Sequence, residues 1–592
     1  MRDPGDVLRI ANCSGFYGDR LSAAREMVEG GPIDVLTGDY LAELTLMILH
    51  RDRQADPSFG YAKTFPLQLR GIAATCLERG IKIVVNAGGL NPAGCAEACR
   101  AVYRQLGLEA RVAHIEGDDL LPRLEALQAA GEPFTHLDRG MPLSRLEAPV
   151  LSANAYLGGW GIAKALELGA DLVICPRVTD ASLVVGPAAW RFGWARDDWN
   201  RLAAAVAAGH ILECGPQATG GNYAFFLGVE GLQCPGFPIA EIAEDGSFTV
   251  TKHPGTGGEV SVGTVTAQLL YEIAAPRYEN PDVTAHFDTL RLTQSAPDRV
   301  HVSGVEDSGI KGEPPPPTTK VCLNYPGGFK NSITFLLTGL DLEDKARLAE
   351  KTMWAHLGGR EQFAETHVSL HRAAENAESI DGSFSFLTVS AKDPDRKKVG
   401  RRFSSAAVEM ALANYPGFNL TAPPGKESPF GVYWPALVSS QAIEHQVVFE
   451  GQTIEIPHTP GEVPEPLPAP LAEPAHYPDT ATEMAPLGRV CGARSGDKGG
   501  NANLGVWTET DAAFEWLSGF LTSDRLHELI PEARDLSIDR YPLPNLRALN
   551  FVLRGFLGDG VAASLATDAQ AKGLGEFLRS RRVEIPSALL ND

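Results

Sequence analysis

The chain has 592 residues, of which 44% are hydrophobic and 21% are charged, and it carries a formal net charge of −22. This length exceeds what one hydrophobic core organises, so we expect two or three domains of ordinary soluble composition. Such an acidic chain gains little from contacts with a phosphate backbone, which excludes nucleic acid as an expected partner.

Cysteine and histidine spacing favours no metal site. The nine cysteines are scattered without a paired framework, as expected in a reducing compartment. Cys95 and Cys99 share a predicted helix face without a second pair, and His367 and His371, four apart on a predicted helix, lack the glutamate of a zinc-protease motif. The chain shows no secretory pattern and no run of 18 apolar residues, which predicts a cytoplasmic protein without membrane association.

The first 130 residues alternate strands and helices four times. Apolar runs at 8–11, 33–36, 81–85 and 110–115 each end in a polar loop, and a helical pattern follows. This alternation predicts an α/β fold whose mostly parallel sheet is covered by helices. Right-handed crossovers then place the loops along one edge of the sheet, where such proteins bind ligands.

The first two loops carry polar candidates for a site. Asn12 and Ser14 follow the first strand and are predicted to bind substrate. If the helix after the second strand begins near Tyr40, Asp39 lies at its cap and Glu43 one turn further. The two carboxylates either stabilise the helix N-terminus or act as acid and base, so both are candidate catalytic residues.

The loop after the third strand combines glycines with two asparagines. Asn86, Gly88, Gly89 and Asn91 precede Pro92, which is suited to the first position of a helix. A loop of this kind directs backbone N–H groups and side-chain amides towards a ligand. We therefore predict that these four residues bind substrate.

Residues 152–180 form the next informative block. Asn154 begins a glycine-rich loop that lacks the dinucleotide-binding fingerprint. Arg177 and Asp180 follow a strand at 172–175 and would lie at its carboxyl end. Asn154 and Arg177 are predicted to bind substrate and Asp180 to be catalytic; alternatively, Arg177 and Asp180 form an ion pair that holds the loop together.

Composition divides the rest of the chain. Strand and turn signals over about 237–340 predict a mixed-sheet subdomain within a main domain of residues 1–458. Eight prolines between Pro460 and Pro486 predict a linker over 459–486, and 487–592 has the size of one small α+β domain.

A predicted loop at 494–503 places Arg494, Asp497 and Lys498 beside three glycines. Glycine allows the backbone to approach an anion, while Arg494 and Lys498 supply positive charge. We predict that these three residues bind substrate; the alternatives are a domain-docking contact and a plain charged turn.

Several of these motifs together resemble the acyclic terpene utilisation protein family, over nearly the whole chain. The resemblance implies a large main domain followed by a small C-terminal ferredoxin-like domain. It also implies a pathway, the bacterial degradation of citronellol and geraniol through acyl-CoA thioesters alongside a biotin-dependent acyl-CoA carboxylase. It supplies no agreed catalytic residues. The segments that carry it are 12–20, 38–43, 86–92, 154–161, 169–180, 494–505, 549–551 and 555–560.

Two functions remain open at this point. The first is an enzyme, a lyase or hydrolase, that acts on a branched or isoprenoid acyl-CoA by hydration, hydrolysis or C–C cleavage. Coenzyme A would then be part of the substrate, and no separate cofactor is identified. The second is a non-catalytic binding or assembly subunit of an acyl-CoA degradation complex, which would associate with the carboxylase. The many polar strand-end loops favour the enzyme, and the size and acidity of the chain favour a homo-oligomer.

Overall fold

The computed structural model describes residues 7–306, 308–374, 376–465 and 481–590. It divides into two compact units, one formed by residues 1–323, 433–558 and 570–592 and the other by residues 324–432 and 559–569. The chain passes from one unit to the other within two long strands, β14 (Thr318–Leu337) and β18 (Ser428–Ser439).

The first unit is built on a sheet that has eleven strands in the described residues, in the order β11-β12-β8-β7-β1-β2-β3-β6-β4-β19-β20. Its five central strands pair in parallel, and each is a short apolar run of the kind that the sequence predicts. They are β1 (Leu8–Asn12), β2 (Val35–Gly38), β3 (Lys82–Val85), β6 (Leu172–Ile174) and β4 (Val112–Glu116).

The outer strands of this sheet are antiparallel, so the sheet is mixed and only its centre is parallel. In the region 237–340, where we expected a mixed-sheet subdomain, four strands extend the main sheet, three short strands within 277–313 form a separate sheet, and β14 joins the sheet of the second unit. The four strands lie on one side of the parallel centre and are β7 (Pro238–Ile242), β8 (Phe248–Lys252), β11 (Leu290–Ala296) and β12 (Arg299–Gly304). On the other side lie two strands from later in the chain, β19 (Gln446–Phe449) and β20 (Gln452–Glu455).

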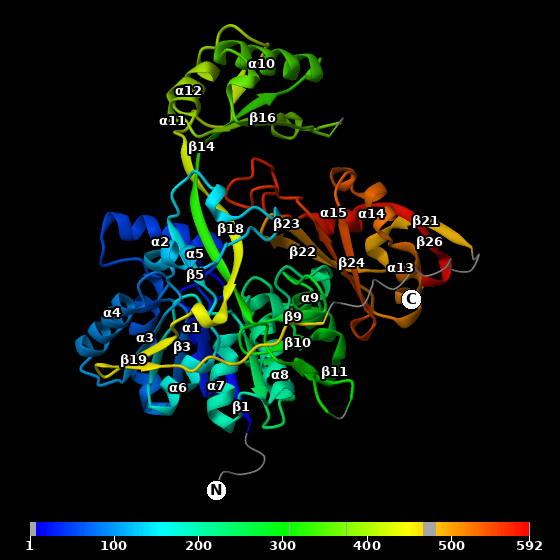
Figure 1. Ribbon diagram of the computed structural model, residues 1–592. Coiled ribbons are helices and arrows are strands. Elements are labelled where there is room, and N and C mark those ends of the chain that lie inside the picture. Colours follow the sequence, from blue (N-terminus) through cyan, green and yellow to red (C-terminus); the bar gives the residue numbers. More distant parts are fainter. Residues whose placement is uncertain (1–6, 307, 375, 466–480, 591–592) are drawn as a thin grey trace. The chain divides into compact units, whose positions relative to one another are not determined.

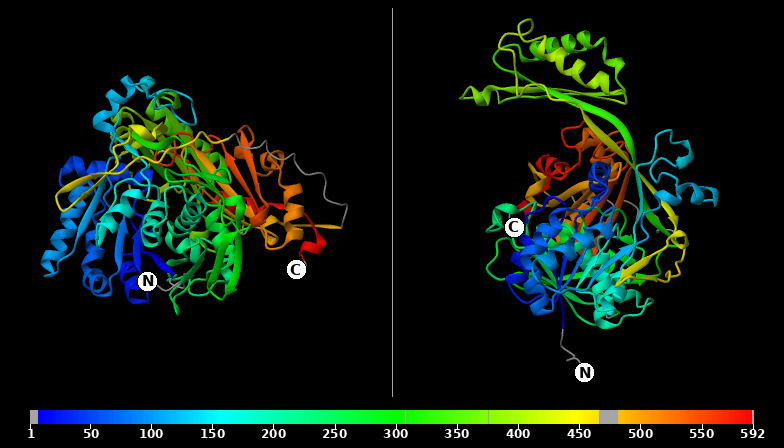
Figure 2. Two further views of the ribbon diagram at one scale, coloured as in Figure 1. Left: turned by 60° about the horizontal axis from the view of Figure 1, so that its bottom comes forward. Right: turned by 90° about the vertical axis from the view of Figure 1, so that its left-hand side faces the viewer.

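Helices cover both faces of the central strands (Figures 1 and 2). Successive strand residues point to opposite faces, so Val35 and Val84 pack in one core and Leu36 and Ile83 in the other. The core of Leu36 contains α1 (Ala23–Glu29), α3 (Thr64–Arg79) and α4 (Pro92–Gln105); that of Val35 contains α6 (Trp160–Glu167), α7 (Ser182–Phe192), α8 (Trp199–Leu212) and α9 (Val262–Leu269). Because helices cover both faces of the central strands, a site can form only at the ends of these strands.

The remaining elements of this region are one longer helix and several short elements. They are α2 (Glu43–Ala55), α5 (Leu124–Ala129), β5 (Ser152–Ala155), β9 (Arg277–Glu279), β10 (Thr284–His286) and β13 (Gly312–Glu313). β5 pairs with β14, so the predicted glycine-rich loop at 154–161 begins within a strand. None of the helices in the described residues combines the length and apolar character needed to cross a membrane.

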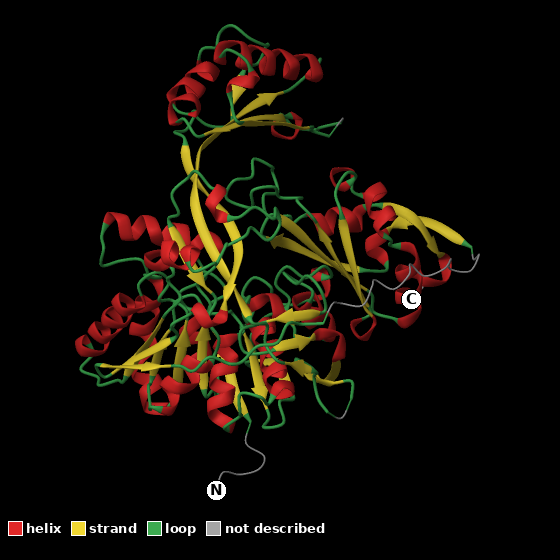
Figure 3. Ribbon diagram, viewed as in Figure 1, coloured by secondary structure: helices red, strands yellow, loops and turns green. Residues whose placement is uncertain are grey.

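The second unit is a sheet with helices on one face (Figure 3). β15 (Glu365–His371), β16 (Ser385–Asp393), β14 and β17 (Asn419–Leu420) form the sheet, and α10 (Leu342–Leu357) and α12 (Arg401–Val408) pack on it, with the short α11 (Arg396–Val399) beside them. His367 and His371 therefore lie on a strand, not on the predicted helix. Four residues of strand span about 13 Å, too far for the two imidazoles to share a metal.

The C-terminal part contains a four-stranded antiparallel sheet of order β22-β23-β25-β24, within the described residues. The predicted loop at 494–503 is in fact a hairpin, because Arg494–Lys498 and Asn501–Asn503 are paired and only Gly499 and Gly500 turn. Gly499 has φ 64°, which glycine adopts without strain. The strands are β22 (Gly492–Lys498), β23 (Asn501–Trp507), β24 (Ile538–Leu543) and β25 (Ala548–Leu553), and the helices are α13 (Asp511–Phe520), α14 (Ser523–Leu529) and α15 (Leu574–Ser580).

The predicted linker at 459–486 ends in structure. Its last residues form β21 (Thr482–Pro486), which pairs with β26 (Arg582–Pro586), while residues 466–480 lie outside the described part of the chain.

Glycines bring the C-terminal sheet close to the segment after α9. A Cβ atom at Gly505 would lie 2.5 Å from Leu270 Cβ, and one at Gly496 would lie 2.4 Å from a ring carbon of Tyr271. Both distances are shorter than any van der Waals contact, so only glycine permits this approach.

Gly505→Val is expected to lower the free energy of unfolding by about 1–3 kcal/mol, because overpacking forces the two surfaces apart. Denaturant unfolding of the full chain measures the effect. Gly519→Ala is the control, since no atom lies within 4 Å of that added Cβ. An equal effect of the two substitutions would contradict this account of the docking.

Candidate functional site at the carboxyl ends of the central strands

The strand-end loops touch one another in a continuous row. The Asp39 N–H donates to Ser14 O at 2.9 Å, the Asn86 N–H to Gly38 O at 3.4 Å, and the Gly88 N–H to Cys175 O at 3.0 Å. These bonds join the loops after β1, β2, β3 and β6, as the parallel arrangement of these strands requires. The sequence prediction that these loops share an edge therefore agrees with the arrangement of the chain.

Asp39 is a buried carboxyl group at the centre of this row. It is 5% exposed, and its Oδ1 accepts bonds from Asn86 Nδ2 at 2.6 Å and from the Leu41 N–H at 3.1 Å. Asn86 Oδ1 in turn accepts from the Tyr40 N–H at 2.7 Å. Burial raises the pKa of Asp39 well above its usual value, and the negative charge of Asp180 raises it further. Asp39 therefore favours its protonated form.

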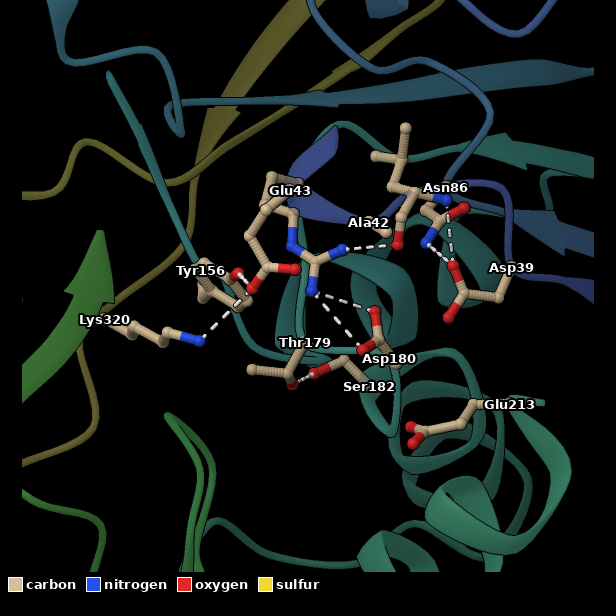
Figure 4. Close-up of polar contacts among 12 residues, drawn as sticks. Asp39, Ala42, Glu43, Asn86, Tyr156, Thr179, Asp180, Ser182, Glu213 and Lys320 are labelled. Atoms are coloured by element: carbon tan, nitrogen blue, oxygen red, sulfur yellow. Dashed lines mark hydrogen bonds and ion pairs between the residues drawn. The ribbon is translucent and has the colours of Figure 1, made fainter. Parts of the chain in front are cut away.

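The helix after β2 begins later than we predicted. α2 starts at Glu43 with Ala42 as its cap, so Asp39 is not a capping residue. Instead, its backbone lies in the loop that joins β2 to the helix, and its side chain turns towards Asn86 (Figure 4). This arrangement removes helix capping as the explanation for Asp39.

Arg177 is the buried cation of the site. Its guanidinium, in a residue 3% exposed, donates to Leu41 O at 2.9 Å and forms an ion pair with Asp180 at 3.0 Å. It also stacks on the ring of Tyr156, 4.1 Å from the centroid. Among the residues that the structure describes, its Nε has no hydrogen-bond partner. The predicted loop-holding ion pair thus exists, and one donor of the same group stays available for a ligand.

Glu43 lies beside one further cation and a phenol (Figure 4). Its Oε1 accepts from Tyr156 Oη at 2.9 Å and lies 3.4 Å from Lys320 Nζ. Although burial by itself would raise the pKa of Glu43, the charges of Lys320 and Arg177 outweigh it and lower the pKa to about 2. Glu43 is therefore ionised at all physiological pH values, which suits charge pairing better than proton donation.

Glu213 is a candidate that sequence analysis missed. It follows α8, is 8% exposed, and lies with its Oε1 2.9 Å from His210 Nδ1. Its Oε2 has no hydrogen-bond partner within the described part of the chain. Burial and the charge of Asp180 raise its pKa well above the usual value, and burial lowers that of His210 to about 4. Asn12 Nδ2 donates to Glu213 O at 3.2 Å, and this bond holds the end of α8 against the end of β1. The only sequence signal was its place at the start of a glycine-rich loop.

Several predicted binding residues instead hold the loops in place. Asn154 donates to Asp118 Oδ2 at 2.7 Å, and the Arg177 N–H donates to the same oxygen at 3.2 Å. Burial raises the pKa of Asp118 to about 7. Ser14 Oγ donates to Phe16 O at 3.0 Å. Through these bonds Asn154 Nδ2 and Ser14 Oγ support the backbone around Arg177 and Asp39, while Asn154 Oδ1 is buried without a hydrogen-bond partner among the described residues.

The loop after β3 divides in the same way. Gly88 must be glycine, because a Cβ there would lie 2.6 Å from Cys175 O, and Gly89 has φ 52°. Asn91 caps α4, accepting from the Gly94 N–H at 2.9 Å, and donates to Phe59 O at 3.0 Å. Of this loop, only the Asn86 side chain bonds to the cluster of polar groups at the strand ends, which consists of Asp39, Glu43, Arg177, Asp180 and Glu213.

The β22–β23 hairpin brings charges from the C-terminal domain to the same region. Lys498 Nζ donates to Glu272 O at 2.5 Å, and burial lowers its pKa. Burial and the charge of Glu272 raise the pKa of Asp497 to about 7. Arg494 stacks on Tyr271, 4.4 Å from the ring centroid. Lys498 and Asp497 thus interact with the cluster, while Arg494 packs at its edge.

The cluster lies away from one surface hollow of the first unit. This hollow, of about 710 Å³, is lined by residues that include Asp197 and Arg201, at the amino end of α8, whereas Glu213 follows the carboxyl end of that helix. Within the described residues, no group of three or more histidine, cysteine, aspartate or glutamate side chains is arranged to hold a metal ion.

The groups of this cluster are of the kind that can transfer protons. Asp39 and Glu213 favour their protonated forms, Asp180 is paired with a guanidinium, and Arg177 Nε can donate to a negatively charged oxygen. Carboxyl groups held in different environments can divide the roles of acid and base.

Comparison with known proteins identifies the family. The sequence profile of the acyclic terpene utilisation family protein AtuA matches residues 8–449, and that of the AtuA ferredoxin-like domain matches residues 485–584. A search of curated proteins finds no match. Because the first profile covers about three quarters of the chain and the second follows it directly, the chain belongs to the AtuA family of acyclic terpene utilisation proteins.

Proposed function

We propose that the protein is an enzyme that acts on a branched or isoprenoid acyl-CoA and performs acid–base chemistry, either hydration of a double bond or cleavage of a carbon–carbon bond. The observation that carries the proposal is that Asp39, Asp180 and Glu213 converge at the strand ends (Figure 4). Asp180 forms an ion pair with Arg177 there. The family's place in acyclic terpene utilisation supports the substrate class.

Hydration needs one base, one acid and one donor to the thioester oxygen. In this scheme Asp180 takes a proton from water as the water oxygen bonds to the β-carbon, and Asp39 or Glu213 delivers a proton to the α-carbon. Arg177 Nε donates to the thioester oxygen, which carries negative charge in between. One water is added, and proton exchange with solvent resets both carboxyl groups.

Cleavage uses the same groups in another order. Asp180 takes the proton of a 3-hydroxyl group, the bond between the α- and β-carbons breaks, and a ketone leaves. The remaining thioester enolate, stabilised by Arg177, takes its proton from Asp39 or Glu213. Both schemes balance without a further reactant, and thioester hydrolysis is the third reaction that the test below distinguishes.

The test is to incubate the purified full chain with branched, α,β-unsaturated and 3-hydroxy acyl-CoA esters and to record masses. Gain of water indicates hydration, two smaller products indicate cleavage, and free coenzyme A indicates hydrolysis. Asp171→Asn is the control and should keep the turnover of the wild type. It alters a carboxylate that is paired with Lys82 just before β6, at the end of the strand opposite to the site. Binding without conversion across the panel would reject the enzyme and favour a binding or assembly subunit.

A further inference from the structure

Glu272 has an unusual backbone conformation that the C-terminal domain holds from both sides. Its φ is 58°, in the left-handed region that side chains with a Cβ avoid. The Glu272 N–H donates to Asn503 Oδ1 at 2.8 Å, and Glu272 O accepts from Lys498 Nζ at 2.5 Å. A non-glycine residue stays in this region only where its surroundings enforce it.

Asn503 is itself fixed by a second buried asparagine. Asn503 Nδ2 donates to Asn550 Oδ1 at 2.6 Å, and Asn550 Nδ2 donates to Ala274 O at 2.6 Å and Ile273 O at 3.2 Å. Both asparagines are fully buried. The β22–β23 hairpin and β25 therefore bind three consecutive residues of the main domain, starting at Glu272.

The Glu272 side chain belongs electrostatically to the acidic cluster. After burial and Asp180, its charge is the next influence that raises the pKa of Glu213, and burial raises its own pKa. Lys498 acts in the opposite direction, lowering the pKa of both carboxyl groups. Glu272 and Lys498 therefore lie near enough to Glu213 for their charges to act on it.

We propose that the C-terminal domain completes the catalytic site: Lys498 and Asn503 are positioning residues that hold the Glu272 carboxyl group beside Glu213, where it serves as a further acid–base group. This inference rests on the proposed function. It gives the ferredoxin-like domain a part in the reaction, and it accounts for the backbone bonds by which that domain holds Glu272 in the left-handed conformation.

The experiment compares variants of the full chain on the acyl-CoA ester that the wild type converts. Lys498→Met and Asn503→Ala are expected to lower kcat about 10²-fold, since small displacements of a reacting group cost that much. Because Lys498 lowers the pKa of Glu213 and Glu272, Lys498→Met should also move the carboxyl-dependent limb of the pH–kcat profile to higher pH.

Two control variants distinguish the positioning of Glu272 from the docking of the C-terminal domain and from a general loss of stability. Asn545 also fastens the C-terminal domain to main-domain carbonyls, donating to Phe287 O and Leu290 O at 2.9 Å, but it does not contact Glu272. Lys330 likewise donates to a backbone carbonyl, Ala562 O at 2.8 Å, within the second unit. Asn545→Ala and Lys330→Met should keep the wild-type kcat and pH profile in their folded fraction.

Glu272→Gly supplies a measurement that needs no substrate. Glycine adopts φ 58° without strain, so the denaturation midpoint should rise while kcat falls as in Lys498→Met. Wild-type kcat and pH profiles for Lys498→Met and Asn503→Ala, or equal losses in Asn545→Ala, would overturn the inference. If the wild type converts no thioester, the proposed function fails. If, in addition, the denaturation midpoint of Glu272→Gly equals that of the wild type, the claim that the C-terminal domain enforces a strained backbone at Glu272 fails as well.

Discussion

Asp39→Asn is expected to abolish most of the activity while leaving the protein at least as stable as the wild type. Loss of a general acid or base lowers kcat by about 10²–10⁴-fold. The fold should tolerate the change, because asparagine has the same shape and its Oδ1 can still accept from Asn86 Nδ2 and the Leu41 N–H.

The pH dependence of stability explains why Asp39→Asn should be at least as stable as the wild type. Burial and Asp180 raise the pKa of Asp39 in the folded state above its unfolded value, so its stabilising contribution is complete below an unfolded pKa of about 4 and is lost as pH rises through the folded pKa. Asparagine has no such loss. The midpoint of Asp39→Asn should therefore exceed that of the wild type by an amount that grows from pH 5 to pH 8.

Denaturant unfolding at several pH values and turnover at pH 7 make the two measurements. Asp171→Asn, at the opposite end of the sheet, should change neither the turnover nor the slope of midpoint against pH. A variant that lost stability and activity together at Asp39 would show that the carboxyl group is structural.

Arg177→Met has the second large expected effect, and here activity and stability should fall together. Methionine keeps apolar contact with the Tyr156 ring but removes the bond to Leu41 O and the ion pair with Asp180. Loss of hydrogen bonds from a charged group costs about 1.5–3 kcal/mol. Loss of the donor to the thioester oxygen should lower kcat by about 10²–10³-fold.

Arg540→Met is the matched control for this substitution. Arg540 is also buried and donates to backbone carbonyls, Leu521 O at 3.2 Å and Ser518 O at 2.7 Å, but it lies in the C-terminal domain away from the cluster. It should destabilise the protein without changing kcat of the folded fraction. Equal retention of kcat in Arg177→Met would remove Arg177 from the site.

Sequence patterns were informative where neighbouring residues decide the structure. The apolar runs of β1, β2 and β3 and their alternation with helices predicted the parallel centre of the sheet and the shared edge of its loops. Because parallel strands end on the same side, the contact between Asp39 and Asn86 and the nearness of Arg177 followed from the order of the elements alone.

Local sequence patterns gave wrong predictions where the same residues are compatible with two different secondary structures. Glycines and charges at 494–503 suit an open loop as well as a hairpin, and histidines four apart suit a helix as well as a strand; pairing with β25 and β16 decided each case. Asn91 and Asn86 are both asparagines of one loop, but only the position of the following helix made the former a cap.

The sequence by itself determined the family, the α/β architecture and most of the strand-end residues of the candidate site. Only the tertiary structure decided which of them converge and that Glu213 and Glu272 join them. The physical reason is distance along the chain: Glu213 reaches the cluster through the packing of α8 on the sheet, and Glu272 through a domain more than 200 residues later, whose Lys498 and Asn503 bind its backbone. No local periodicity encodes such contacts.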